Sequence, residues 1–144
     1  MVLKMSINDY NDLLQEIADI DVNVSSIADS KHLMVDLNER EEELIQLRKV
    51  LVKEIHSIEI EHIKKKKSII NRYPKNHSSG IISIFRGSNK KRRIKALKHL
   101  DTNVKSKIEA YCEVKYMADD LLLQIKEMKH SANDFIKESL GNQL

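Results

Sequence analysis

The sequence has few of the residues that form turns and thick cores. Its 144 residues include three glycines and one proline, too few turn-forming residues for a β-rich or loop-rich fold. Aromatic residues make up 4% of the chain and tryptophan is absent, whereas an ordinary globular core uses more of these large side chains. We therefore expect a single domain that buries its apolar residues in stripes along helices.

Cysteine and long apolar runs are also scarce. Cys112 is the single cysteine, so an internal disulfide is excluded, which fits a reducing compartment. Residues 1–5 lead into a polar stretch and lack the apolar region of a secretory signal. No segment approaches the roughly 18 apolar residues that span a bilayer. These features predict a soluble, cytoplasmic protein.

The residues that are abundant favour an all-α fold. Charged residues make up 33% of the chain, and together with many Ile and Leu they are typical of a long helix or bundle. Ser6 and Asp9 form a variant of the capping box, which starts a helix. Apolar residues follow at steps of three and four: Ile7, Tyr10, Leu14 and Ile17. We predict a first helix at about 6–28, with weaker helix propensity over 21–26.

A second helix is predicted at about 30–72. Its apolar residues recur every seven positions, at Leu37, Leu44, Leu51 and Ile58, so one apolar seam faces a partner helix. Arg40 and Glu54 interrupt this seam. Further apolar residues lie beside it, at Ile45, Val50, Val52 and Ile55. Because this face is wider than a two-stranded coiled coil needs, we expect a third helix or a second subunit to cover it.

A loop at about 74–88 is predicted to separate the second helix from a third at about 88–139. Pro74 disfavours helix at the preceding residue, and Gly80 and Gly87 flank a short apolar segment. The third helix has a seven-residue repeat: Leu97, Val104, Tyr111, Ala118, Ile125 and Ala132. Gly141 can end it.

These elements predict a long antiparallel helical hairpin of coiled-coil type. The short N-terminal helix would join the two long helices in a three-helix or oligomeric bundle. The alternative is that the long helices pair between subunits. In both cases we expect the heptad faces to mediate self-association or binding of a protein partner.

Charge is distributed very unevenly along the chain. Residues 62–100 contain thirteen Lys or Arg and no acid, whereas the remainder contains twelve bases and twenty-two acids. The overall charge of +3 therefore combines a segment of +13 with a remainder of −10. We predict a polyanion-binding surface within this segment, formed by Lys64, Lys65, Lys66, Lys67, Arg72, Arg86, Lys90, Lys91, Arg92, Arg93 and Lys95. Lys75 and Lys98 complete the set of bases.

The position of these bases on the predicted helices favours a functional contact. Lys64–Lys67 lie near a helix C-terminus, where the helix dipole favours cations. Lys90–Lys98 lie near the predicted start of the next helix, where the dipole disfavours them. Because convergence of like charge is unfavourable, we interpret the segment as a surface for a polyanion. The alternative is a role in solubility or in self-assembly with an acidic region.

Two kinds of polyanion fit the segment. Nucleic acid would be bound through phosphates, without sequence-specific readout, because no known DNA- or RNA-binding motif is present. Anionic lipid is the alternative. The bases flank a short apolar tip, and apolar insertion combined with basic residues anchors peripheral membrane proteins. That tip consists of Ile81, Ile82, Ile84 and Phe85. It could equally plug the end of the hairpin or contact a protein.

Catalytic and metal-binding patterns are weak. Glu59 with His62 and Glu127 with His130 have the spacing found in metal-binding helical bundles. We predict that both pairs lie beside the apolar seams rather than on them, and far from each other. Cys112 has no histidine within one or two helical turns to act as a base. We therefore expect no metal site, no cofactor, no small-molecule substrate and no enzymatic activity.

The leading interpretation is a non-enzymatic helical adaptor or scaffold subunit of a larger complex, with a basic hairpin end that contacts a polyanion such as nucleic acid. A peripheral membrane protein that uses the apolar tip is the alternative. A helical-bundle metal protein is a remote third possibility, which requires the two Glu–His pairs to meet across subunits.

Overall fold

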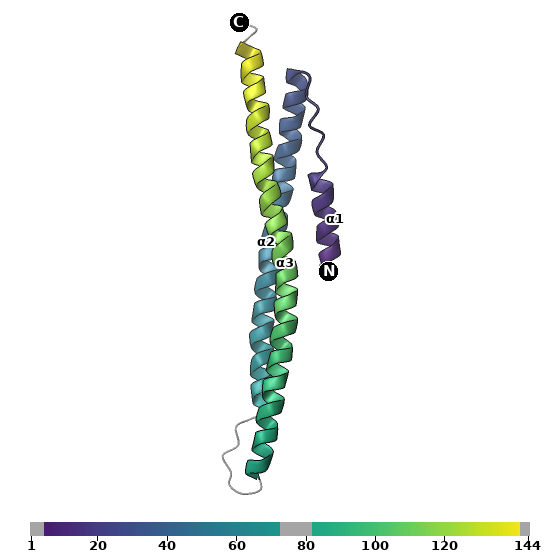
Figure 1. The fold of residues 1–144 in the computed structure, drawn as a ribbon. Coiled ribbons are helices and arrows are strands. Elements are labelled where there is room, and N and C mark those ends of the chain that lie inside the picture. Colours follow the sequence, from purple (N-terminus) through teal and green to yellow (C-terminus); the bar gives the residue numbers. More distant parts are fainter. Residues whose placement is uncertain (1–4, 73–81, 142–144) are drawn as a thin grey trace. The chain divides into compact units, whose positions relative to one another are not determined.

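The computed structural model describes residues 5–72 and 82–141, and it leaves the side chains of 82–89 undescribed. These residues form three helices, α1 (Ile7–Ala18), α2 (Ile27–Arg72) and α3 (Ile82–Gly141), and the described part contains no strand. α2 and α3 run in opposite directions and pack against each other (Figure 1). The predicted all-α hairpin is therefore confirmed.

The chain divides into two compact units. The first unit comprises residues 1–52 and 112–144, and it contains α1, the first part of α2 and the last part of α3. The second unit comprises residues 53–111, and it contains the last part of α2 and the first part of α3. None of the helices, over the residues that the structure describes, is long and apolar enough to cross a membrane.

The core of the first unit follows the predicted heptads. Leu37, Leu44 and Leu51 of α2 are 0% exposed, as are Ala118 and Ile125 of α3. A seven-residue repeat brings these side chains to one side of each helix. Their burial explains why the two helix segments pack together.

α1 lies against α2 and α3 in the first unit through Tyr10, Leu14 and Ile17, which are all buried. Its predicted capping box is present. The Asp9 amide donates to Ser6 Oγ at 3.2 Å, and the Ser6 amide donates to Asp9 Oδ2 at 2.9 Å. The Asp9 carboxylate accepts the bond from the Ser6 amide, and this bond is the main reason that the pKa of Asp9 lies below its ordinary value of 3.8. The Ser6 side chain lowers the pKa further.

α1 ends at Ala18, so the prediction of a helix to about residue 28 was wrong. The connecting residues 19–26 form local side-chain hydrogen bonds, which compete with helix formation. The Asn23 amide donates to Asp21 Oδ1 at 3.1 Å. The Asp29 amide donates to Ser26 Oγ at 3.1 Å, which caps the start of α2 at Ile27.

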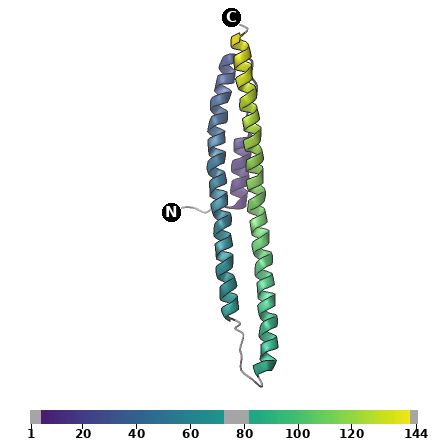
Figure 2. The same cartoon turned by 90° about the vertical axis from the view of Figure 1, so that its left-hand side faces the viewer.

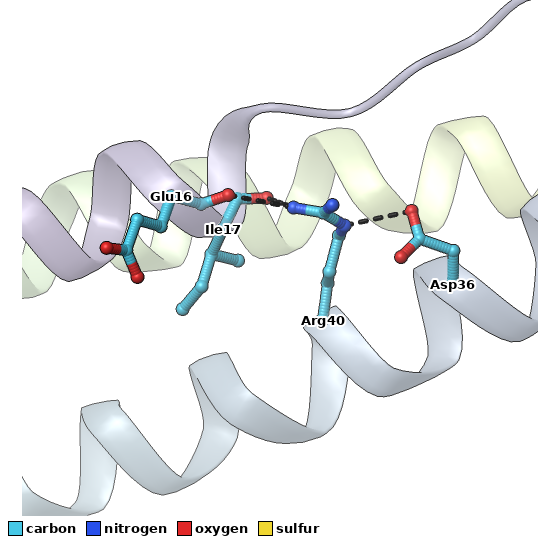
Figure 3. A network of polar contacts seen from close by, with 4 residues as sticks. All are labelled: Glu16, Ile17, Asp36 and Arg40. Carbon is cyan, nitrogen blue, oxygen red and sulfur yellow. Dashed lines mark hydrogen bonds and ion pairs between the residues drawn. The ribbon is translucent and has the colours of Figure 1, made fainter.

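Arg40 closes the C-terminal end of α1. Its Nη1 donates to the backbone oxygens of Glu16 at 2.9 Å and of Ile17 at 2.7 Å, while its Nε donates to Asp36 Oδ2 at 2.9 Å (Figure 3). The last carbonyls of a helix have no partner within the helix, and the last turn of α1 contains no basic residue. The Asp19 amide reaches the oxygens of Gln15 at 3.1 Å and Glu16 at 3.3 Å. Arg40 therefore adds a second donor at Glu16, a donor at Ile17, and the positive charge that this helix end lacks.

α3 begins at Ile82 rather than near residue 88, so the predicted loop at 74–88 was too long. Gly87 lies inside the helix. A single glycine costs a helix only about 1 kcal/mol relative to alanine, which is not enough to stop it. Residues 73–81 lie outside the described part of the chain.

Candidate polyanion-binding surface

The basic segment lies entirely within the second unit. This unit has sixteen bases and five acids, a net charge of +11, whereas the first unit has nine bases and seventeen acids, a net charge of −8. The end of α2 lies beside the early part of α3 in both views (Figure 1 and Figure 2). The hairpin thus brings two basic helix segments, 64–72 and 90–98, into one unit. We call the basic side chains of these two segments the basic surface.

An acidic residue marks one limit of the basic surface. Asp101 of α3 lies 3.1 Å from His62 Nε2 and 3.6 Å from Lys66 Nζ, measured from its Oδ1 atom. These two contacts fix the register of α2 against α3 at this point. Asp101 is also the first acid that follows the basic segment in the sequence.

Most of the basic side chains are accessible to a ligand. Lys66 and Arg93 are half-buried, and the other described bases are exposed: Lys64, Lys65, Lys67, Arg72, Lys90, Lys91, Arg92, Lys95 and Lys98. Two bases have an acidic partner, since Lys65 lies 3.2 Å from Glu61 and Lys66 lies 3.6 Å from Asp101. The remaining nine have none among the residues that the structure describes. Their positive charge is therefore not neutralised within the described part of the chain.

The position of Lys90–Lys98 on α3 differs from the prediction. Because α3 begins at Ile82, Lys90 is its ninth residue, and the cations do not lie at the helix N-terminus. The dipole effect falls off within the first turn. The unfavourable term at this surface is therefore repulsion between like charges and not the helix dipole.

The apolar tip is also placed differently from the prediction. Ile82, Ile84 and Phe85 belong to the first turn of α3 rather than to a loop. Ile81 and the side chains of residues 82–89, including Arg86, lie outside the described part, as does Lys75. The proposed role of this tip stays a prediction.

His62 occupies an inward position that the heptad pattern did not predict. The repeat through Ile58 continues to Lys65, yet the Lys65 side chain is 57% exposed and that of His62 is 18% exposed. His62 Nδ1 is buried without a hydrogen-bond partner in the described part of the structure. An α-helix has 3.6 residues per turn, so a 3.5-residue seam drifts around it. That drift explains why His62 lies on the seam and not beside it.

In the second Glu–His pair, the ionic contact of His130 lies within its own helix. His130 Nε2 lies 3.3 Å from Asp134 Oδ2, and the His130 side chain is 79% exposed. His62 and Glu127 belong to different units. No group of three or more His, Cys, Asp or Glu side chains comes together as a metal site in the described ranges 5–72 and 82–141. Cys112 is a free, half-buried thiol.

The sequence did not reveal the role of Arg40, because a base within an apolar seam has no distinctive local pattern.

Comparison with protein-family models, with curated proteins and with solved structures found no match to this chain.

Proposed function

We propose that the protein is a non-enzymatic helical scaffold or adaptor subunit that uses the basic surface to contact nucleic acid through its phosphates. The observation that supports this most directly is the set of nine described bases without an acidic partner, gathered on two antiparallel helix segments. Phosphate contacts of this type need cations but no base-reading motif. The first unit, with its net charge of −8, would stay away from the nucleic acid.

The proposal assigns different roles to the two units. The basic surface binds the polyanion, and the helical sides of the first unit bind protein. Packed leucines suit a scaffold, because a well-packed helical pair presents a stable surface to a protein partner. Leu37, Leu44 and Leu51 provide such packing in the first unit.

A charge-reversal pair of variants tests the proposal. The test variant replaces Lys90, Lys91, Arg92 and Arg93 with Glu. The matched control replaces four other exposed lysines with Glu, namely Lys31, Lys105, Lys107 and Lys137. Both variants change the net charge equally, so a non-specific effect of charge affects them alike. We expect the test variant to lose binding to duplex DNA or RNA in a gel shift, and the control to retain most of it.

Anionic vesicles provide the second arm of the same experiment. Co-sedimentation with vesicles but no shift of either nucleic acid would contradict the nucleic-acid proposal and favour the membrane alternative. Absence of binding to all three ligands at moderate salt would show that the basic surface serves the protein's own structure or assembly.

A further inference from the structure

The first unit has an open groove on a face of the α2–α3 pair that α1 does not line. The groove has a volume of about 560 Å³ and is lined by Ile45, Arg48, Lys49, Asp119, Leu122, Leu123 and Lys126. All of these residues belong to α2 or α3. Two other hollows of the same unit are lined in part by α1, through Leu13 in one and Leu14 in the other. The groove is therefore not covered by the chain's own short helix.

The floor of the groove is apolar. Ile45 and Leu122 are half-buried, and Leu123 is 57% exposed. Val52, which is 43% exposed, follows Ile45 one heptad later on α2. This spacing extends an apolar strip over about 10 Å, two turns of helix. Such a strip matches the apolar face of another helix.

The rim of the groove is basic on both sides. Arg48 is neutralised by Asp119, whose Oδ1 lies 2.6 Å from its Nε. Lys49 on α2 and Lys126 on α3 are exposed, and neither has an acidic partner within the described ranges. A surplus of positive charge is unusual in this unit, whose net charge is −8. A ligand seated between the two walls would meet one ammonium group on each flank.

We propose that this groove binds an amphipathic helix of a partner protein, with acidic residues on both sides of its apolar stripe. The inference rests on the scaffold part of the proposed function and specifies its protein partner. α1 provides a precedent within the same unit. It contains the acids Asp9, Asp12 and Glu16 but no base. Arg40 of α2 donates to backbone oxygens at the C-terminal end of α1, so an acid-rich helix already docks on this unit. A symmetric contact with a second copy is disfavoured, because it would bring the basic rims of two grooves together.

Two labelled peptides of about 21 residues, three heptads each, probe the groove by fluorescence anisotropy. Both have leucine at the two seam positions of each heptad, and the flanking positions are Glu in one and Lys in the other. We expect the Glu peptide to bind the full-length protein, and the Lys peptide to bind at least about tenfold more weakly, a difference of about 1.4 kcal/mol.

Matched variants locate the binding site. Leu123→Ser with Lys126→Glu should weaken binding of the Glu peptide by at least about tenfold. Val35→Ser with Lys31→Glu is the control, because both side chains are exposed on α2 and do not line the groove. Circular dichroism and thermal unfolding verify that both variants fold.

Three results would overturn the proposal. The first is no binding of the Glu peptide at about 100 µM. The second is equal binding of the two peptides, or equal effects of the groove variant and its control. The third is a concentration-dependent dimer in sedimentation that the groove variant abolishes, since a second copy would then occupy the groove. The reversal at Lys90–Arg93 should leave peptide binding unchanged, so failure of this proposal is distinguishable from failure of nucleic-acid binding.

Discussion

Replacing Arg40 with methionine should raise the population of molecules in which α1 is detached from α2 and α3. Methionine keeps much of the apolar stem of the side chain, but it removes the two hydrogen bonds to the backbone oxygens of Glu16 and Ile17. It also removes the positive charge beside the C-terminal end of α1. A helix of 12 residues is marginal on its own, so α1 depends on contacts of this kind.

The magnitude follows from the chemistry of these bonds. The Arg40 side chain is 22% exposed, so water only partly screens its interactions. A hydrogen bond to a charged group contributes about 1.5–3 kcal/mol. The two carbonyls regain water when α1 detaches, so we take one such bond as the net effect. At about 1.4 kcal/mol for each factor of ten, the detached population should rise about 10- to 150-fold.

Hydrogen exchange measured by mass spectrometry reports this population directly. Amides of residues 10–18 should exchange faster in Arg40→Met by the factor given above, while amides near Leu44 and Ile125 keep their protection. Arg48→Met is the matched control, because it removes an exposed ion pair between α2 and α3. Neither residue of that pair lines the hollows bordered by α1. Unchanged exchange of α1 in Arg40→Met, or an equal increase in Arg48→Met, would refute the assigned role.

Two further predictions concern the core and the capping box. Leu44→Ala should lower the free energy of unfolding by about 2–5 kcal/mol in urea denaturation, because Leu44 is 0% exposed. Val35→Ala, at a residue that is 58% exposed, should change it by less than about 0.5 kcal/mol; equal effects would contradict the assigned core. The pKa of Asp9 is lower in the folded state than its ordinary value of 3.8, so its stabilisation of α1 is complete above that value and lost as the pH falls further. Asp9→Asn should therefore weaken the acid sensitivity of α1 exchange, whereas Asp12→Asn should preserve it.

The sequence predicts the packing of the first unit well because heptad spacing is a local property. The repeats through Leu44 and Ile125 placed apolar side chains on one face of each helix, and these side chains are buried. The capping box at Ser6 was equally predictable, since it depends on residues three positions apart. The concentration of bases over 62–100 is also a property of the sequence alone.

The features that the sequence did not predict depend on contacts between distant residues. Arg40 interrupts an apolar seam, and its function is visible only when the end of α1 lies beside it. The inward position of His62 depends on how far the seam has drifted around α2. The groove at Leu123 is lined by residues of both α2 and α3 and by none of α1, so it is visible only once the packing of the helices is known.

The most direct test of the nucleic-acid contact is the salt dependence of binding to a fluorescent DNA duplex of about 20 base pairs, measured by anisotropy. If four or five of the bases without acidic partners reach phosphates, the logarithm of the binding constant should fall with that of the salt concentration with a slope of about −4. The fourfold reversal at Lys90–Arg93 should abolish binding, and the control reversal at Lys31, Lys105, Lys107 and Lys137 should not. Equal loss in both variants, or no binding by the unmodified protein at low salt, would contradict a nucleic-acid contact at the basic surface.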